Sequence, residues 1–344
     1  MSVPLYVPVL PTRQHATAAY RALTPDVQRR VAPLWTLPPR PGMLPKPLAE
    51  AIAKDVGHVT AAQGGGRAWL DAPFADEAQA AVLARTLPPE WWDHRNLRPV
   101  TGPGHPAEQQ ALALAVARRS RSGLGVRVRL PGEWKDRAAA DLDALLDRLP
   151  DGLSADLFLD LGAVLSDRPD AAKEALRALD VLVPLAPWRA VVVMSGGFPD
   201  PPDDFLEGHP VEEPRADWEV WDEIRHSERP YLAGLHHGDY GIHPATYVAQ
   251  TPTSREGGPS WGILRYTSPR SYHLVKVPLG KQHDDANREA ARCLTRLAEF
   301  RGVGASAGER WLHDRARGVV TTGNHAVWNR VGNVQHMTFV RNSL

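Results

Sequence analysis

The segment from Leu235 to Pro244, with the sequence LHHGDYGIHP, holds the densest titratable chemistry of the chain. It places three imidazoles, a carboxylate and a phenol beside two glycines, which let the backbone turn with positive φ so that several side chains can converge. Histidine titrates near neutral pH, so His237 with Asp239 beside it suits general acid–base catalysis. We interpret the segment as the lip of a pocket and predict that His237, Asp239 and Tyr240 are catalytic.

Metal binding is an alternative use of the same side chains. Histidine and carboxylate ligands suit zinc or iron, and Asp71 or Asp160 would supply a further ligand. Adjacent histidines on a strand point to opposite faces, however, and no HxH or HExxH spacing is present. We therefore assign no metal ligands, although the pattern leaves a divalent metal open. A third alternative is that the histidines are hydrogen-bonded structurally in a crowded loop.

Strand-like and helix-like segments alternate along the chain and must position these side chains. The strand-like segments cover residues 5–10, 31–37, 68–72, 97–101, 125–130, 155–164, 188–194 and 231–235. A helical pattern follows each of the first seven, and eight such strands predict an α/β protein with a (β/α)8 TIM-barrel-like fold. A doubly wound open sheet would give the same local patterns and stays open as the alternative.

The C-terminal part of the chain exceeds a basic barrel. We predict that residues 1–245 supply the eight barrel strands and that residues 246–344 pack on the same domain. This extension would contain an inserted strand pair over residues 261–266 and 272–277 and an amphipathic helix over 284–300 that closes the barrel. Its tail would end in a strand over residues 337–340.

Barrel enzymes carry their chemistry at the carboxyl ends of the strands, which directs attention to Arg13, Asp71, Arg129 and Asp160. Arg129 and Asp160 lie inside apolar strands, where a charge costs several kcal/mol unless it is paired or lines a wet pocket. We predict that Arg13 and Arg129 hold an anion, that Asp71 also contacts the substrate, and that Asp160 handles protons or orients the ligand. The alternative is an internal Arg129–Asp160 ion pair that stiffens the barrel.

Two glycines after the seventh strand, Gly196 and Gly197, also suit the binding of an anion. Their backbone N–H groups can approach a phosphate closely, and the loops after strands seven and eight are the usual phosphate site of barrels. The pair is also consistent with a simple turn. We predict that both glycines bind substrate.

The overall composition excludes some partners. Lys+Arg and Asp+Glu both number 40, so the net charge of zero does not indicate nucleic acid or acidic membranes. The single cysteine, Cys293, cannot form an intrachain disulfide, which favours a reducing compartment. No apolar run of about 18 residues and no signal-peptide pattern is visible. We expect a cytoplasmic protein with a small anionic ligand and no membrane contact, and a protein partner stays open.

Several short motifs together resemble the Beta protein family of phage and bacterial proteins over nearly the whole chain. The matching pieces are YVPVL at 6–10 with Arg13-Gln14, APLW at 32–35, Asp71, Arg129, LDLG at 159–162, GGFP at 196–199, GDYGI at 238–242 with His243-Pro244, RYT at 265–267, Trp328 and His336. GDYGI and RYT are the most specific of these. On the strength of this resemblance we add Arg265 and His336 to the predicted substrate-binding residues.

The resemblance implies a barrel-like protein, with some members in mobile or phage-conflict gene neighbourhoods, but it supplies no reaction. Relatives tend to carry a lysine and a glutamate around the first strand and a glutamate after the second, where this chain has Pro11, Ala16 and Thr36. Two hypotheses follow. The first is a barrel enzyme of hydrolase or lyase type that acts on a small phosphorylated or nucleotide-like anion by acid–base or metal-assisted chemistry. The second is a non-catalytic component of a phage-defence or mobile-element system that senses a ligand or nucleic acid.

Overall fold

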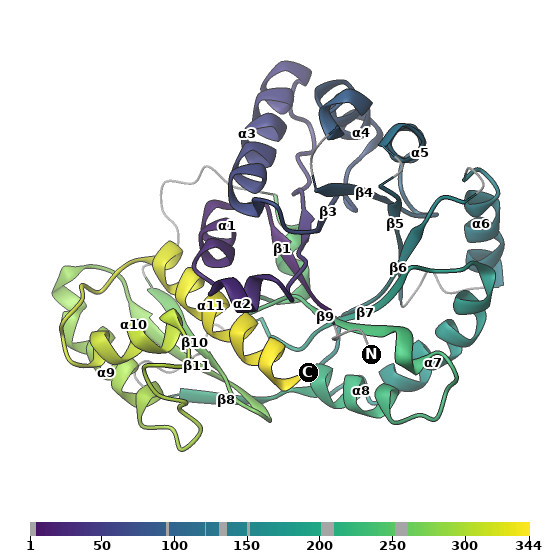
Figure 1. The fold of residues 1–344 in the computed structure, drawn as a ribbon. Coiled ribbons are helices and arrows are strands. Elements are labelled where there is room, and N and C mark those ends of the chain that lie inside the picture. The colour runs from purple at the N-terminus through teal and green to yellow at the C-terminus, as the bar shows by residue number, and fades with distance from the viewer. Residues whose placement is uncertain are drawn as a thin grey trace.

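A closed parallel barrel forms the centre of the protein, as the predicted TIM-barrel-like fold requires (Figure 1). The computed structural model describes residues 5–93, 96–120, 122–130, 136–149, 152–200, 210–251 and 261–344. The barrel strands, in spatial order, are β1 (Tyr6–Pro11), β2 (Leu34–Thr36), β3 (Ala68–Asp71), β4 (Leu97–Thr101), β5 (Leu124–Arg129), β6 (Ala155–Ala163), β7 (Ala190–Gly196) and β9 (Leu235–Asp239). His237 of β9 pairs with Tyr6 of β1 on one side and with Val193 of β7 on the other. This closure rules out the doubly wound open sheet.

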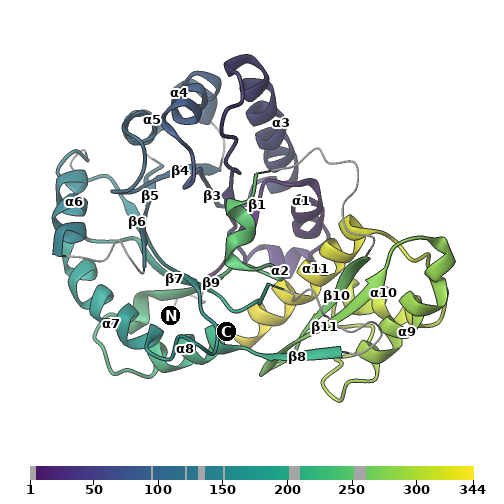
Figure 2. The same cartoon turned by 180° about the vertical axis from the view of Figure 1, so that it is seen from behind.

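Helices cover the outside of the barrel, as Figures 1 and 2 show from its two ends. They are α1 (Gln14–Arg21), α2 (Pro25–Gln28), α3 (Pro45–Gln63), α4 (Glu77–Thr86), α5 (Ala107–Ser120), α6 (Asp136–Leu146), α7 (Ala171–Leu182) and α8 (Ala216–Arg225). Short 3-10 helices lie between them at η1 (Pro89–Trp92), η2 (Val183–Leu185), η3 (Leu232–Gly234) and η4 (Ala245–Ala249).

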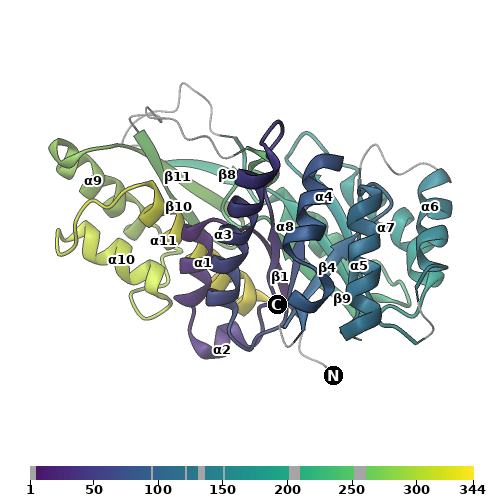
Figure 3. The same cartoon turned by 90° about the horizontal axis from the view of Figure 1, so that it is seen from above.

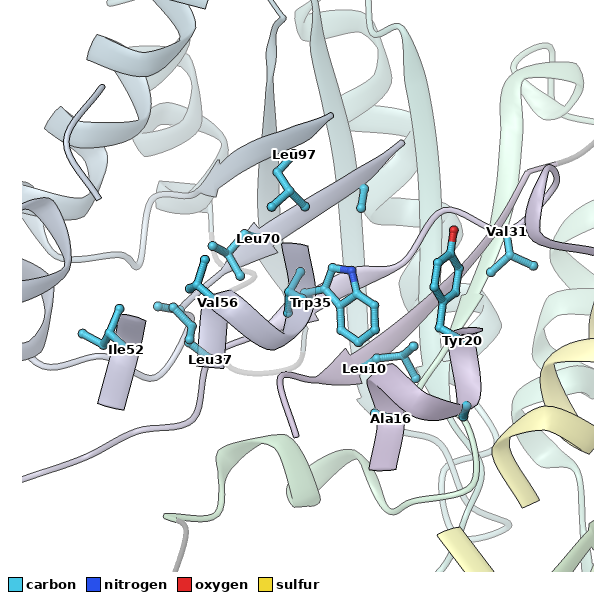
Figure 4. Packing of buried hydrophobic residues seen from close by; sticks show 14 of the residues in the cluster. Leu10, Ala16, Tyr20, Val31, Trp35, Leu37, Ile52, Val56, Leu70 and Leu97 are labelled. Carbon is cyan, nitrogen blue, oxygen red and sulfur yellow. The ribbon is translucent and has the colours of Figure 1, made fainter. Parts of the chain in front are cut away.

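Successive strand residues alternate between the barrel interior and its outer surface. Inside, Trp69 of β3 and Phe158 of β6 meet edge to face across the barrel, with their ring centroids 5.0 Å apart. Outside, Trp35 of β2 packs against Tyr20 of α1, and residues such as Ile52 of α3 complete the same apolar cluster (Figure 4). Each strand is therefore buried on both faces, which explains why strands such as β7 are nearly continuous apolar runs.

The eighth barrel strand lies later in the chain than predicted. Residues 231–235 were the predicted strand, but η3 occupies most of that segment and β9 begins at Leu235. The prediction was wrong because it followed the apolar run. The true strand carries polar residues that are buried by tertiary contacts, so hydrophobicity alone selects its neighbour.

The predicted strand pair is confirmed as β10 (Trp261–Thr267) and β11 (Ser271–Pro278), and a third strand that was not predicted joins it. This strand, β8 (Pro210–Pro214), pairs antiparallel with β11 to give the order β10-β11-β8. Its sequence, Pro-Val-Glu-Glu-Pro, has the charges and prolines of an edge strand and lacks the apolar signal of a buried one.

The helix predicted to close the barrel packs elsewhere. Helix α9 (Asp284–Thr295) lies on the β10–β11 sheet and beside α10 (Ala307–Ala316), and Figure 3 shows both helices to one side of the barrel. We call β8, β10, β11, α9, α10 and the short η5 (Lys281–His283) the extension.

The C-terminal helix α11 (His325–Ser343) instead lies between the barrel and the extension, where it contacts α1, β1 and β10 (Figure 1). The predicted strand over residues 337–340 was therefore wrong, since that segment is helical. Both sides of α11 are covered, so residues 331–340 are buried all round, polar ones such as Gln335 and His336 included, and the helix lacks the one-sided apolar pattern of a surface helix.

Candidate functional site

A cavity of about 400 Å³ opens at the carboxyl ends of the barrel strands. Its wall includes Phe74 after β3, Arg129 at the end of β5, Asp160 of β6 and Tyr240 directly after β9, and one face of η4 covers a further side. The volume lies within the range of small-molecule sites, and the position is where barrel enzymes carry their chemistry. Three predicted site residues, Arg129, Asp160 and Tyr240, therefore line one cavity.

A buried ionic network lies at the cavity floor and is centred on Arg127. Its guanidinium donates to Asp71 Oδ2 (2.8 Å), to Asp160 Oδ2 from both Nε (3.1 Å) and Nη2 (2.8 Å), and to Tyr240 Oη (2.9 Å). His105 Nε2 lies 2.9 Å from Asp71 Oδ1 and completes what we call the Arg127 network. Strands β3, β5 and β6 and the segment after β9 are thus joined across the barrel interior.

The predicted set omitted Arg127, although a signal for it exists in the sequence. Residues two apart on a strand point to the same side, so Arg127 and Arg129 of VRVRL must both face the interior. The alternative of an internal Arg129–Asp160 ion pair is wrong, because the arginine that pairs with Asp160 is Arg127. Arg127 lies deeper in the barrel, whereas Arg129 lies at the rim.

Burial and charge fix the protonation of the Arg127 network. Burial alone would raise the pKa of Asp71, but His105 and Arg127 outweigh it and hold that pKa below its usual range. Burial would lower the pKa of Arg127, and Asp160 and Tyr240 together with Asp71 reverse this effect and raise it. Burial, followed by the Asp160 carboxylate, raises the pKa of Tyr240 well above that of a free phenol. Tyr240 is therefore a protonated hydrogen-bond donor at neutral pH.

Asp160 has both carboxylate oxygens engaged by the protein. Oδ1 accepts from Tyr240 Oη at 2.7 Å and from the Gly162 backbone N–H at 2.9 Å, while Oδ2 accepts the two bonds from Arg127. A carboxylate offers about four lone-pair sites, and these four donors fill them. In this arrangement Asp160 orients Tyr240 and the end of β6, and a proton-accepting role would require one donor to move.

Arg129 is the cation that the cavity offers to a ligand. Its guanidinium lies 4.9 Å from the ring centroid of Phe74, and no carboxylate of the described residues forms an ion pair with it. Arg168, the other arginine of the wall, pairs with Glu174 at 2.6 Å and donates to backbone carbonyls of β6. Arg168 is therefore already paired within the protein, whereas the Arg129 guanidinium is available to a ligand.

The predicted residues His237, Asp239 and His336 lie together, but on the outer side of the barrel wall. Asp239 Oδ2 lies 3.0 Å from His336 Nε2 of α11 and 3.5 Å from His237 Nε2, and Oδ1 accepts from Tyr6 Oη at 2.7 Å. A Cβ on Gly238, the strand residue between them, would meet interior side chains, which confirms that its neighbours point outward. We call Tyr6, His237, Asp239 and His336 the wall network.

The wall network is sealed from solvent by helices. The His237 ring lies between those of Trp218 and Trp221 of α8, with centroids 5.3 and 5.2 Å away, and His336 is fully buried. Burial alone would raise the pKa of Asp239, but His336 and His237 hold it well below its usual range. The geometry joins the barrel to α11 and gives none of these side chains access to the cavity.

Gly196 and Gly197 are closely packed by other parts of the chain. A Cβ on Gly196 would lie 3.1 Å from that of Ala245 and 3.2 Å from Cδ2 of Tyr240, and one on Gly197 would overlap the Asp217 carboxylate. The glycines therefore let η4 and α8 approach the end of β7. Their predicted role as amide donors to a phosphate stays a prediction.

Arg13 and Arg265, the two remaining predicted arginines, lie on a different face of η4 from the cavity. Arg13 Nη1 donates to Tyr247 Oη at 2.6 Å, and Arg265 on β10 donates to Asn329 Oδ1 at 3.0 Å. Neither arginine lines the cavity.

The described ranges contain no group of three His, Cys, Asp or Glu side chains arranged to hold a metal ion. Within the same ranges, no helix has the length and apolar character needed to cross a lipid bilayer.

Comparison with known proteins identifies the family to which the chain belongs. The sequence model of the Beta protein family matches residues 6–342, which is almost the full chain. The chain belongs to the Beta protein family. No curated protein and no solved structure matched it.

In this Beta protein family member, the positions at which relatives were expected to differ carry no titratable group. Pro11 and Thr36 are register partners at the carboxyl ends of β1 and β2, and Thr36 is buried with its hydroxyl unpaired. Ala16 is also buried and packs in the outer apolar cluster that contains Trp35 (Figure 4). The titratable groups of the cavity wall therefore come from strands β5 and β6 and from the segments after β6 and β9.

Proposed function

We propose that this protein binds a small anionic ligand in the cavity at the carboxyl ends of the barrel strands and acts on it in the cytoplasm. The observation that carries the proposal is Arg129, a half-buried guanidinium at the rim of a 400 Å³ cavity with no ion pair to a described carboxylate. A guanidinium binds phosphate or carboxylate oxygens in a bidentate manner, which favours a phosphorylated or nucleotide-like ligand. The single cysteine supports a reducing compartment.

The chemistry proposed for this site is acid–base chemistry of hydrolase or lyase type. Tyr240, which lines the cavity, would turn its phenolic hydrogen from Asp160 to a ligand oxygen and donate the proton there. Asp160, which loses that donor, would accept the proton that the ligand or an attacking water releases and return it to Tyr240. Arg127, together with His105, would keep the Asp71 carboxylate charged.

A non-catalytic, ligand-sensing function is the second candidate, and a specific observation favours it. All lone-pair sites of Asp160 are filled by protein donors, and the ends of β1 and β2 present Pro11 and Thr36 in place of charged groups. A site of this kind would bind an anion without turning it over.

The two candidates separate in one set of measurements. Wild-type protein is screened by thermal shift against phosphorylated metabolites, nucleotides and dicarboxylates, and each stabilising compound is titrated into Arg129→Met and Arg129→Lys. We expect Arg129→Met to weaken binding by about tenfold or more, which corresponds to about 1.4 kcal/mol, and Arg129→Lys to weaken it less. Arg29→Met, which removes an exposed arginine paired with Asp26, is the control.

The products of an overnight incubation are then analysed by mass spectrometry. Turnover that Tyr240→Phe abolishes while binding persists would establish the enzyme. Binding without turnover would establish the sensor. The absence of any anionic ligand, or equal affinity in wild type and Arg129→Met, would contradict the proposed site.

A further inference from the structure

A group of cationic and imidazole side chains gathers where the barrel meets the extension. Arg13 follows β1, His15 lies on α1, His243 and Tyr247 lie in the segment after β9, and Arg265 lies on β10. The His15 and His243 ring centroids are 5.6 Å apart, and His243 stacks on Tyr247 at 4.0 Å. The Arg13 guanidinium lies 4.4 Å from the Tyr247 ring centroid. Three segments thus bring their side chains into contact, and Arg265 on a fourth lies near enough for its charge to act on both histidines.

Helix η4 separates this group from the cavity. In a 3-10 helix, residues three apart share a face. Thr246 and Ala249 share the face that lines the cavity, whereas Tyr247 and Gln250 lie one residue further on and both accept hydrogen bonds from Arg13. The group is therefore a site of its own that shares η4 as a wall with the cavity.

The group has positive charge without an acidic counterpart. No ion pair joins Arg13 or Arg265 to a carboxylate of the residues that the structure describes, whereas the buried Arg127 has two ion pairs and the buried Arg315 has one. Burial, followed by Arg13 and Arg265, lowers the pKa of His15 to about 4, and burial with Arg265 lowers that of His243 well below its usual value. Burial lowers the pKa of Arg265 to about 10. The fold therefore concentrates cations here at a cost that no described side chain offsets.

Several polar atoms of the group also lack hydrogen bonds. His15 Nε2, His243 Nε2 and Arg265 Nε are buried, and none has a partner within the described structure. His243 is only 4% exposed, so its free nitrogen is sealed inside the group. Buried polar atoms are normally satisfied, and an oxyanion would accept a hydrogen bond from Arg265 Nε and from each imidazole in the tautomer that carries its hydrogen on Nε2.

We propose that Arg13, His15, His243 and Arg265 form a second anion site, which binds a phosphate group at the junction of the barrel and the extension. A tetrahedral dianion accepts hydrogen bonds from several directions and so matches donors that come from a loop, a helix, a second loop and a strand. Because these donors belong to both the barrel and the extension, the bound phosphate holds the two together. It also fixes η4, which is a wall of the cavity. This site is independent of the function proposed for the cavity.

The test uses the full-length protein and inorganic phosphate as the probe, titrated by calorimetry at low ionic strength. Arg265→Gln and Arg13→Gln are compared with wild type. Arg270→Gln is the matched control, since it removes an exposed arginine from the turn that follows β10. We expect phosphate to bind wild type and Arg270→Gln equally and to bind each of the two site variants at least about tenfold more weakly. Phosphate bound at Arg129 in the cavity is lost in Arg129→Met, so the affinity of the second site is measured from the binding that remains in this variant.

A second measurement avoids variants that fold poorly. In wild-type protein, phosphate should shift the imidazole NMR signals of the half-buried His15 and the buried His243, and leave that of the exposed His226 in place. AMP in place of phosphate distinguishes a free ion from the phosphate of a larger ligand, because only tighter binding of AMP than of phosphate indicates the latter.

Three results would overturn the second site. They are no phosphate binding, equal binding by Arg265→Gln, Arg13→Gln and Arg270→Gln, or binding that Arg129→Met removes and Arg265→Gln retains. The last result would place phosphate in the cavity, so the function proposed there would stand while the second site would fail.

Discussion

Replacing Arg127 with methionine tests the electrostatic account of the barrel interior. The substitution keeps most of the side-chain volume but removes all four hydrogen bonds to Asp71, Asp160 and Tyr240. Two buried carboxylates then lose their shared cation. Removing one partner of a buried ion pair typically costs about 3–5 kcal/mol, because the remaining charge stays desolvated. We expect a loss of that size in the free energy of unfolding at pH 7.

The pH dependence of this loss gives a second, independent check. In the wild type, the pKa of Asp71 is lowered on folding, so its stabilising contribution is complete above about pH 4 and is lost as pH falls toward its folded pKa. Without Arg127, the carboxylate of Asp71 takes up a proton at higher pH than in the wild type, because one of the two groups that lower its pKa is gone. The difference in stability between variant and wild type should therefore shrink as pH falls from 7 to 5.

Urea unfolding followed by tryptophan fluorescence measures both quantities, and the sequence contains 11 tryptophans. Arg29→Met serves as the control, because Arg29 and Asp26 are 69% and 61% exposed and such a pair contributes about 0–1 kcal/mol. A loss below about 1 kcal/mol for Arg127→Met, or a loss that does not change between pH 7 and pH 5, would refute the reasoning.

Three further predictions concern the neighbouring contacts. Tyr240→Phe removes one donor from Asp160 and should cost about 1–3 kcal/mol of unfolding free energy, measured by urea denaturation; no change would show that the Asp160 bond is not formed. Asp239→Asn should destabilise the protein at pH 7 and make its free energy of unfolding less dependent on pH between pH 5 and pH 3. The reason is that the lowered pKa of Asp239 stabilises the fold above about pH 4, and this contribution disappears on acidification. Equal pH profiles of variant and wild type would argue against the wall network. Gly197→Ala should lower the melting temperature, because its Cβ would overlap the Asp217 carboxylate, and overpacking of this kind costs about 1–3 kcal/mol. An unchanged melting temperature would show that α8 can shift away from the new Cβ at little cost.

The barrel was predictable from sequence because its strands are buried on both faces and therefore read as apolar runs. Strand β4 (Leu97–Thr101), for example, has the predicted bounds. The elements that were misassigned lack such a local signal. Strand β8 is short and charged, and β9 is polar. Helix α11 is buried on all sides by the barrel and the extension, so it shows no one-sided apolar pattern.

The candidate site was predictable only as far as strand ends can be located. Arg129, Asp160 and Tyr240 line one cavity because each lies at or after the end of a strand. Whether the Asp239 side chain points into the barrel or out of it depends on where β9 begins. A strand start that is wrong by a few residues therefore leaves this direction undetermined. Its partner His336 lies 97 residues further along the chain, and only the packing of α11 against the barrel brings the two together.

A crystal structure of protein purified from cells under native conditions, with native mass spectrometry of the same sample, tests the central claim most directly. We predict an anion in the cavity with an oxygen within hydrogen-bonding distance of the Arg129 guanidinium, and a matching mass that is lost in Arg129→Met. A cavity that contains only water, with Arg129 paired to a carboxylate of the protein, would contradict the claim.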